Sequence, residues 1–269
     1  MKKLFYFIGV LAISLMGCED VIDVDLPESE PRLVIDAEIF RTLDTDETLL
    51  RVILSQSTPF FDEQIRFVND AEVLITSSND ETFLLEAIGE GEYTNPNIVV
   101  ENDISYSLEV TFEGETYTAT ETIETVMPLE FVEQDDEGGF DNESIELKVY
   151  FTDPAGIENY YFFEGLSERG NSFDALEDEF FDGNPIFGFY FVDDLEAGDE
   201  VTFRLSGIDV QYYDYLFTLL QQTGDQSGGP FEVQPATVRG NIVNQTDPDN
   251  YPLGYFRISE VSILTYTVQ

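Results

Sequence analysis

Short runs in which apolar and polar residues alternate make up most of the chain, and each run predicts a β-strand. In one of them Tyr106, Leu108 and Val110 are separated by polar residues, the pattern of a strand with one buried and one solvated face. A second run, 115–122, follows Gly114, so the pair predicts a β-hairpin. The other strands predicted in this part of the chain cover residues 31–40, 49–57, 71–77, 82–86 and 91–93. Short strands separated by turns roughly ten residues apart are typical of an antiparallel β-sandwich.

The pattern restarts around Met127, which predicts a domain boundary there. The first domain, a β-sandwich, is expected over residues 31–127, and a β-rich C-terminal domain over residues 128–269. Strands are expected in the second domain at 144–152, 160–164, 186–192, 201–206 and 254–268. The acidic, glycine-containing segment 133–143 is expected to form a loop.

Two segments of the second domain favour helices. Within residues 208–222, Val210, Tyr213 and Leu216 recur at helical spacing, and residues 174–181 are a shorter candidate. We therefore expect an all-β, mainly antiparallel protein. Its first domain resembles Ig-like and prealbumin-like β-sandwiches in the order of its strand motifs, and its second domain is β-rich with one or two short helices. That resemblance concerns the fold alone and implies no chemistry.

The N-terminus has the pattern of an exported lipoprotein. Basic Lys2 and Lys3 precede an uncharged apolar run, residues 4–17, which is shorter than the roughly 20 residues that a membrane-spanning helix needs. The pattern indicates a signal peptide over residues 1–17. Its end, Leu-Met-Gly before Cys18, resembles the lipobox of bacterial lipoproteins, which implies cleavage before Cys18 and acylation of that residue. The alternative is an ordinary signal peptide followed by a cysteine that has no such role.

Residues 18–30 are expected to form an acidic tether. Glu19 and Asp20 resemble the surface-export signal of Bacteroidota lipoproteins, which implies a lipid-anchored protein on the outer membrane that faces the cell exterior. The alternative is a solvated linker without an export role. Each buried methylene of an acyl chain contributes roughly 0.8 kcal/mol, so two or more chains on Cys18 would hold the protein stably on the membrane.

Composition excludes several classes of function. The chain has 11 Lys and Arg against 56 Asp and Glu, a formal charge of −45, and no His. Without His there is no Ser-His-Asp catalysis and no His-bound metal, and the negative charge disfavours nucleic-acid binding. A single Cys excludes an internal disulfide. The 23 Phe and 14 Tyr indicate a real core, so the acids lie outside it, either for solubility in a salt-adapted organism or for cation binding.

The many carboxylates raise the question of catalysis or calcium. The pairs 135–136 and 193–194 and the run 177–179 contain carboxylates, as glycosidases require, but nothing singles one out, so we expect no enzyme activity. Acidic loops also supply the oxygen ligands that calcium prefers. The calcium candidates are Asp135, Asp136, Asp141, Asp247 and Asp249. Neither loop has the EF-hand register, so the alternative is a pair of solvated loops without a cofactor.

Two aromatic-rich segments, 159–163 and 187–191, contain more aromatic residues than simple alternation would bury. Either the core packs against both faces of these strands, or an exposed aromatic patch binds a partner. The sequence leaves both readings open.

A series of segments resembles the family of domain-of-unknown-function 4249. Besides the opening around Cys18, the segments are 33–37, 55–60, 71–73, 91–93, 117–119, 212–222, 228–231, 240–242 and 253–256. Members of the family are Bacteroidota lipoproteins, often encoded beside TonB-dependent receptors, and no activity is established for them. The resemblance implies a non-enzymatic accessory of such a receptor, which captures cargo or gates the barrel. The alternatives are a free-standing surface binding module or adhesin, with or without calcium, and behind these a carboxylate-based hydrolase.

Overall fold

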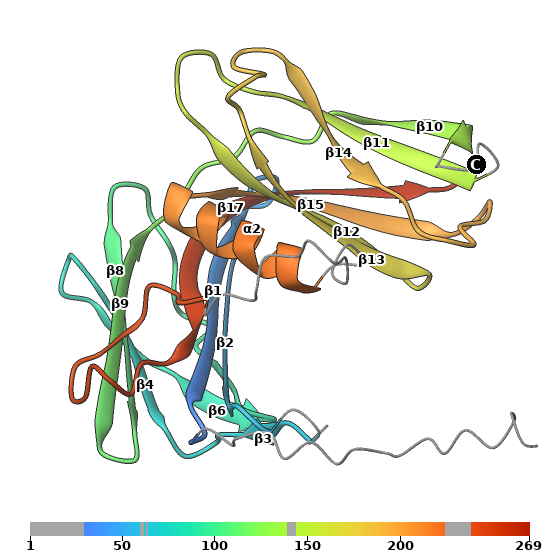
Figure 1. Cartoon of the computed structure of the whole chain (residues 1–269). Helices are drawn as coiled ribbons and strands as arrows, with labels where there is room; N and C mark the ends of the chain where they lie inside the picture. The colour runs from blue at the N-terminus through green and yellow to red at the C-terminus, as the bar shows by residue number, and fades with distance from the viewer. Residues whose placement is uncertain (1–29, 60–61, 63, 139–143, 224–237) are drawn as a thin grey trace, which may run out of the picture. The chain divides into compact units, whose positions relative to one another are not determined.

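The computed structural model describes residues 30–59, 62, 64–138, 144–223 and 238–269. Within these residues the chain forms three β-sheets and one helix, α2 (Val210–Thr223) (Figure 1). The strands are β1 (Leu33–Thr42), β2 (Thr48–Gln56), β3 (Arg66–Phe67), β4 (Glu72–Ser77), β5 (Thr82–Leu84), β6 (Glu86–Gly89), β7 (Glu92–Thr94), β8 (Ser105–Phe112), β9 (Glu115–Thr122), β10 (Phe131–Gly138), β11 (Ser144–Thr152), β12 (Tyr160–Ser167), β13 (Gly170–Glu177), β14 (Pro185–Tyr190), β15 (Glu200–Ile208), β16 (Val243–Asn244) and β17 (Leu253–Thr267). All but one of the strand pairs within the sheets are antiparallel, so the prediction of an all-β, mainly antiparallel protein with a helix is confirmed.

The first core lies between two sheets. The largest sheet has the order β13-β12-β15-β17-β1-β2-β7-β6, with β3 paired to β2, and the five-stranded sheet has the order β16-β9-β8-β4-β5. In β1 the alternate residues Ile35, Ala37 and Ile39 are buried in this core, while Asp36 and Glu38 lie on the opposite face. The predicted hairpin of β8 and β9 supplies buried side chains from the facing sheet.

A second core forms between the other end of the largest sheet and the three-stranded sheet β10-β11-β14. Strand β17 serves both cores, because it pairs in parallel with β1 and, further along, antiparallel with β15 (Figure 1). Phe256 and Ile258 pack in the first core, and Leu264 and Tyr266 pack against the second. All four are even-numbered positions, so both cores lie on the same face of β17.

Close to the predicted boundary at residue 127, the chain passes from the first core to the second. Ile123 belongs to the first core and Val126 to the second. The chain then returns, since Ile242 and the start of β17 pack in the first core again. Residues 31–269 accordingly form one compact unit, in which the last strand completes the first sandwich.

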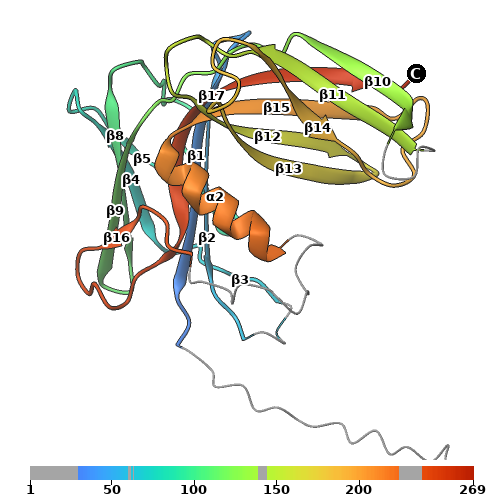
Figure 2. The ribbon, with the colours of Figure 1, turned by 45° about the horizontal axis from the view of Figure 1, so that its top comes forward.

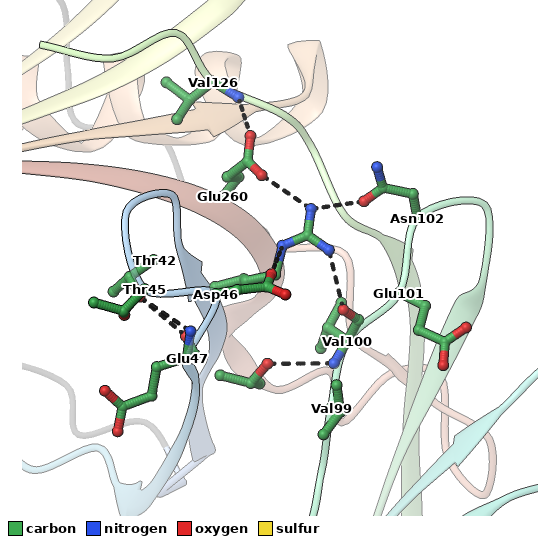
Figure 3. A network of polar contacts seen from close by, with 12 residues as sticks. Thr42, Thr45, Asp46, Glu47, Val99, Val100, Glu101, Asn102, Val126 and Glu260 are labelled. Carbon is green, nitrogen blue, oxygen red and sulfur yellow. Dashed lines mark hydrogen bonds and ion pairs between the residues drawn. The ribbon is translucent and has the colours of Figure 1, made fainter.

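A polar network that includes Asn102, Val126 and Glu260 (Figure 3) forms around Arg41 and ties the first sandwich to the junction. The guanidinium of Arg41 donates to the carboxylate of Glu260 at 2.9 Å, to Oδ1 of Asn102 at 2.7 Å and to the carbonyl of Val100 at 3.2 Å. The other oxygen of Glu260 accepts from the backbone N–H of Val126 at 3.1 Å. One carboxylate on β17 therefore links β1 to the segment that crosses between the cores.

Helix α2 covers the face of the largest sheet opposite the cores (Figure 2). Its position agrees with the helix predicted over residues 208–222. The side chain of Asp209 caps it, because Oδ1 accepts from the backbone N–H of Tyr212 at 2.6 Å. Leu216 packs against Phe162 of β12 and Ile208 of β15 in a small cluster of its own.

Two local predictions are wrong. Residues 174–181 do not form a helix: Asp174 is in β13, an edge strand of the largest sheet that pairs with β12. The predicted loop 133–143 is a strand in its first part, because β10 is an edge strand that pairs with β11, and residues 139–143 lie outside the described residues. Edge strands tolerate charged side chains, and such composition is easily taken for a loop or a helix.

The first aromatic segment is packed from both faces. Tyr161 and Phe163 are buried in the second core, and Phe162 is buried on the opposite face beneath α2. In the second segment Tyr190 is buried in the core, whereas Phe187 is 40% exposed and lies against Tyr150. The reading of a doubly packed core is therefore confirmed for residues 160–163.

Candidate functional site

The residues of the predicted anchor, Cys18, Glu19 and Asp20, lie outside the described residues, as does Asp141. Among the described residues no helix is both long and apolar enough to cross a bilayer. The lipid anchor and the export signal therefore stay predictions from the sequence.

The remaining calcium candidates are exposed, and the hydrogen bonds of their carboxylates within the described residues are local. The carboxylate of Asp135 accepts from the backbone N–H of Glu137 at 3.0 Å, and that of Asp247 accepts from the N–H of Asp249 at 3.1 Å. Asp136 accepts from the side chain of Gln134. These residues do not come together in any group of three carboxylates close enough to share one ion within the described part of the chain.

The acidic group that the structure does bring together is Asp153, Asp178 and Asp182. Asp153 accepts from the hydroxyl of Tyr161 and from the N–H of Gly183, the latter at 3.1 Å. Asp178 accepts from the N–H of Asn159 at 3.0 Å, and its burial raises the pKa of its carboxyl group. The cluster joins two loops that are distant in sequence, and its carboxylate oxygens are of the type that hold hard cations.

A cavity of about 430 Å³ opens between α2 and the outer face of the largest sheet. It is lined by Val34, Asp36 and Ala37 of β1, by Tyr212, Tyr215 and Leu219 of α2, by Leu253, Gly254, Tyr255 and Arg257 of β17, and by Val238. Three of the segments that carry the family resemblance, 33–37, 212–222 and 253–256, therefore meet at this cavity. The family resemblance therefore indicated these cavity-lining segments in advance, although they are far apart in the sequence.

The parallel pairing of β1 with β17 sets the floor of the cavity. Its register places Asp36 beside Tyr255 and Glu38 beside Arg257. Gly254 permits the close approach, because its φ is +93° and a Cβ there would lie 2.1 Å from the carbonyl oxygen of Ile35. An alanine at this position would push the two strands apart.

Three tyrosine rings form one wall. The ring centroid of Tyr255 lies 4.8 Å from that of Tyr212 and 5.1 Å from that of Tyr215, and the two rings on α2 are 5.8 Å apart. These separations are those of rings in direct contact. The three side chains therefore act as a single aromatic surface, with no space between them for a ligand.

A charge-balanced network lies next to this wall. The carboxylate of Glu38 pairs with Arg257 at 2.7 Å and with Arg204 at 3.2 Å, and Arg204 lies 3.5 Å from the carboxylate of Glu164. The guanidinium of Arg257 also lies 5.2 Å from the ring centroid of Tyr212. Two positive and two negative charges thus neutralise each other across four adjacent strands.

Asp36 differs from its charged neighbours because it has no partner among the described residues. No hydrogen bond of its side chain and no ion pair within 4.0 Å occurs in the described residues. The Asp36 side chain is solvent-exposed, but the surrounding protein partly desolvates its carboxyl group and so raises the pKa. Glu38 also raises this pKa, while Arg257 and Arg51 lower it. The cavity therefore contains one carboxylate whose charge no ion pair neutralises.

A much smaller cavity, about 10 Å³, shares Tyr212, Tyr255 and Arg257 with the first in its lining. Its lining includes the carboxylates of Glu121, Glu124 and Asp209. Burial raises the pKa of Glu121 to about 7, with Asp209 and Glu124 adding to the effect and a hydrogen bond from Asn241 opposing it. The hydroxyl of Tyr255 is buried without a partner and within electrostatic range of Glu121 and Asp209. The volume fits one water molecule, which these groups could bind.

The comparisons with known proteins give one family and no activity. A family model described as "Domain of unknown function (DUF4249)" matches residues 19–264. No curated protein matches the chain. The solved structure of a segment of two fibronectin type III domains from chicken tenascin aligns with 66% of this chain and 91% of its own, at 13% identity and a TM-score of 0.20.

Proposed function

We propose that this protein, which belongs to the DUF4249 family, is a surface lipoprotein of the outer membrane. It captures a small ligand for a TonB-dependent receptor and catalyses no reaction. The observation that carries the binding role is the cavity of about 430 Å³ beneath α2. Sites for small ligands are typically concave, mostly apolar and provided with a few polar groups, and roughly 300–1,000 Å³ in volume. This cavity meets each of these conditions.

The location is supported by Cys18, the single cysteine of the chain, which follows the apolar run 4–17. Acyl chains on this residue would confine the protein to the plane of the membrane. Confinement raises the effective concentration of the protein at a receptor in the same membrane, so a weak protein–protein contact would suffice. The receptor itself is proposed from the family resemblance.

A second candidate is a free-standing binding module or adhesin that depends on calcium. The observation that favours it is the group of Asp153, Asp178 and Asp182, which offers three carboxylates within reach of one ion. Its carboxylates already close the two loops through hydrogen bonds, so we place this candidate second.

Affinity purification of the chain from outer membranes solubilised in mild detergent tests the proposal. We expect a TonB-dependent receptor to co-elute, as identified by mass spectrometry, and the Cys18→Ser variant to remain unacylated and to lose the receptor. Elution of the acylated chain without any outer-membrane barrel protein would contradict the role as an accessory. Addition of a calcium chelator distinguishes the second candidate from the first, because only the calcium-dependent binding module requires the ion for binding.

A further inference from the structure

We propose that the cavity beneath α2 binds a small organic cation, with the aromatic or apolar body of the ligand against the tyrosine wall and its amino or guanidino group at Asp36. The proposal rests on the proposed binding role of the same cavity and names the chemical class of its ligand.

The charges that line the cavity select the sign of the ligand. Arg257 is the one cation in the lining, and its guanidinium is held by Glu38 at 2.7 Å. Asp36 is the one anion in the lining, and it has no hydrogen bond or ion pair in the described residues. Arg51 is exposed and acts on Asp36 from outside the cavity. An incoming ammonium group would therefore gain a charge-assisted hydrogen bond that an anion could not make.

The tyrosine wall favours the same class of ligand. The faces of Tyr212, Tyr215 and Tyr255 carry negative electrostatic potential, which attracts cations and the edges of other aromatic rings. Because the three rings touch one another, they cannot enclose an ammonium group as an aromatic cage does. The ligand is instead expected to lie flat against the wall, where Val34, Leu219 and Leu253 complete the apolar lining.

The rest of the molecule supports capture of a cation. The chain carries a formal charge of −45, and a field of this sign raises the local concentration of cations and speeds their association. The network of Glu38, Glu164, Arg204 and Arg257 adds no net charge next to the site. Neither feature favours an anionic ligand.

Isothermal titration calorimetry with three matched probes tests the proposal on the full chain in lipid nanodiscs. Phenethylamine, phenethyl alcohol and hydrocinnamate share an aromatic body and differ in charge. We expect phenethylamine to bind at least about tenfold more tightly than the other two probes. The Asp36→Asn variant should reduce this preference to about twofold or less, because it removes the charge and keeps the shape. The matched control Glu109→Gln removes one carboxylate from an exposed position of β8 and should leave the preference unchanged.

Four outcomes would overturn the proposal. Equal or tighter binding of hydrocinnamate, or no binding of any probe, contradicts a cation site. If phenethyl alcohol binds as tightly as the amine and Tyr215→Ala weakens both, the class of ligand is wrong while the binding role of the cavity stands. An unchanged preference in Asp36→Asn, with unchanged far-ultraviolet circular dichroism, also contradicts the assigned position of the cation.

Discussion

Helix α2 covers two regions of one sheet face, and these regions differ in their packing. Over β12 and β15, Leu216 closes on Phe162 and Ile208, and all three side chains are buried. Over β1 and β17 the same helix leaves a cavity whose floor carries the unpaired Asp36. One helix thus supplies both a packed hydrophobic contact and an open site.

The difference shows which part of this sheet face stabilises the fold and which part is open to a ligand. Buried apolar contacts of Leu216 hold one side of α2 against β12 and β15, and this fixes the position of Tyr212 and Tyr215 over the cavity. A cavity and an unpaired carboxylate contribute nothing to folding. The proposed ligand uses this cavity and its solvent-exposed carboxylate.

Truncation of a side chain should lower the free energy of unfolding much more in the packed region than at the cavity. This is the largest effect that we predict. Phe162→Ala should lower the free energy of unfolding by about 3–5 kcal/mol, because it opens a hole in the packed region. Val34→Ala, at the cavity, should lower it by about 1 kcal/mol or less. Urea denaturation followed by circular dichroism measures both. Equal losses in the two variants would contradict the comparison.

Loss of the shared carboxylate in the ion-pair network should have the next largest effect. Glu38→Gln leaves Arg204 and Arg257 without their common partner and should cost about 3 kcal/mol in the same denaturation experiment. Glu196→Gln is the control, since its carboxylate is 71% exposed in its pair with Arg169 and should matter by less than about 1 kcal/mol. A Glu38→Gln variant as stable as this control would show that the network does not hold the strands under α2.

The smallest predicted effect depends on pH. The folded pKa of Glu121, about 7, lies above its ordinary value of 4.5, so the folded state binds more protons than the unfolded state between these values. Stability should therefore fall as the pH rises through this window. Glu121→Gln removes that loss, and because the side chain is partly exposed we expect a gain of about 1 kcal/mol at pH 8 and none below pH 4. Urea denaturation at the two pH values measures the difference. A gain that does not grow with pH would contradict the raised pKa.

Local patterns in the sequence predict the elements better than they predict the site. The alternation around Leu108 predicts a strand with one buried face, and the hairpin β8–β9 has this form because its register is set by neighbouring residues. The spacing of Val210, Tyr213 and Leu216 predicts α2 for the same reason. On the edge strands β10 and β13, charged side chains hide the strand pattern, and only pairing with a partner reveals it.

The site depends on contacts that no local pattern encodes. Asp36 lies beside Tyr255 only because the first strand pairs in parallel with the last. The acidic pairs considered from the sequence could not point to Asp36, since its distinction is the absence of a partner in space. The cluster of Asp153, Asp178 and Asp182 was missed in the same way, because two loops must meet to form it. What the sequence did provide was the set of segments shared with the family, and three of these line the cavity.

A crystal structure of the chain soaked with phenethylamine tests the central claim most directly. We predict density for the ring against Tyr212 and Tyr215, with the amino group in hydrogen-bond contact with the carboxylate of Asp36. An empty cavity beneath α2 at a concentration that saturates binding in solution, or a ligand whose amino group points away from Asp36, would contradict the account.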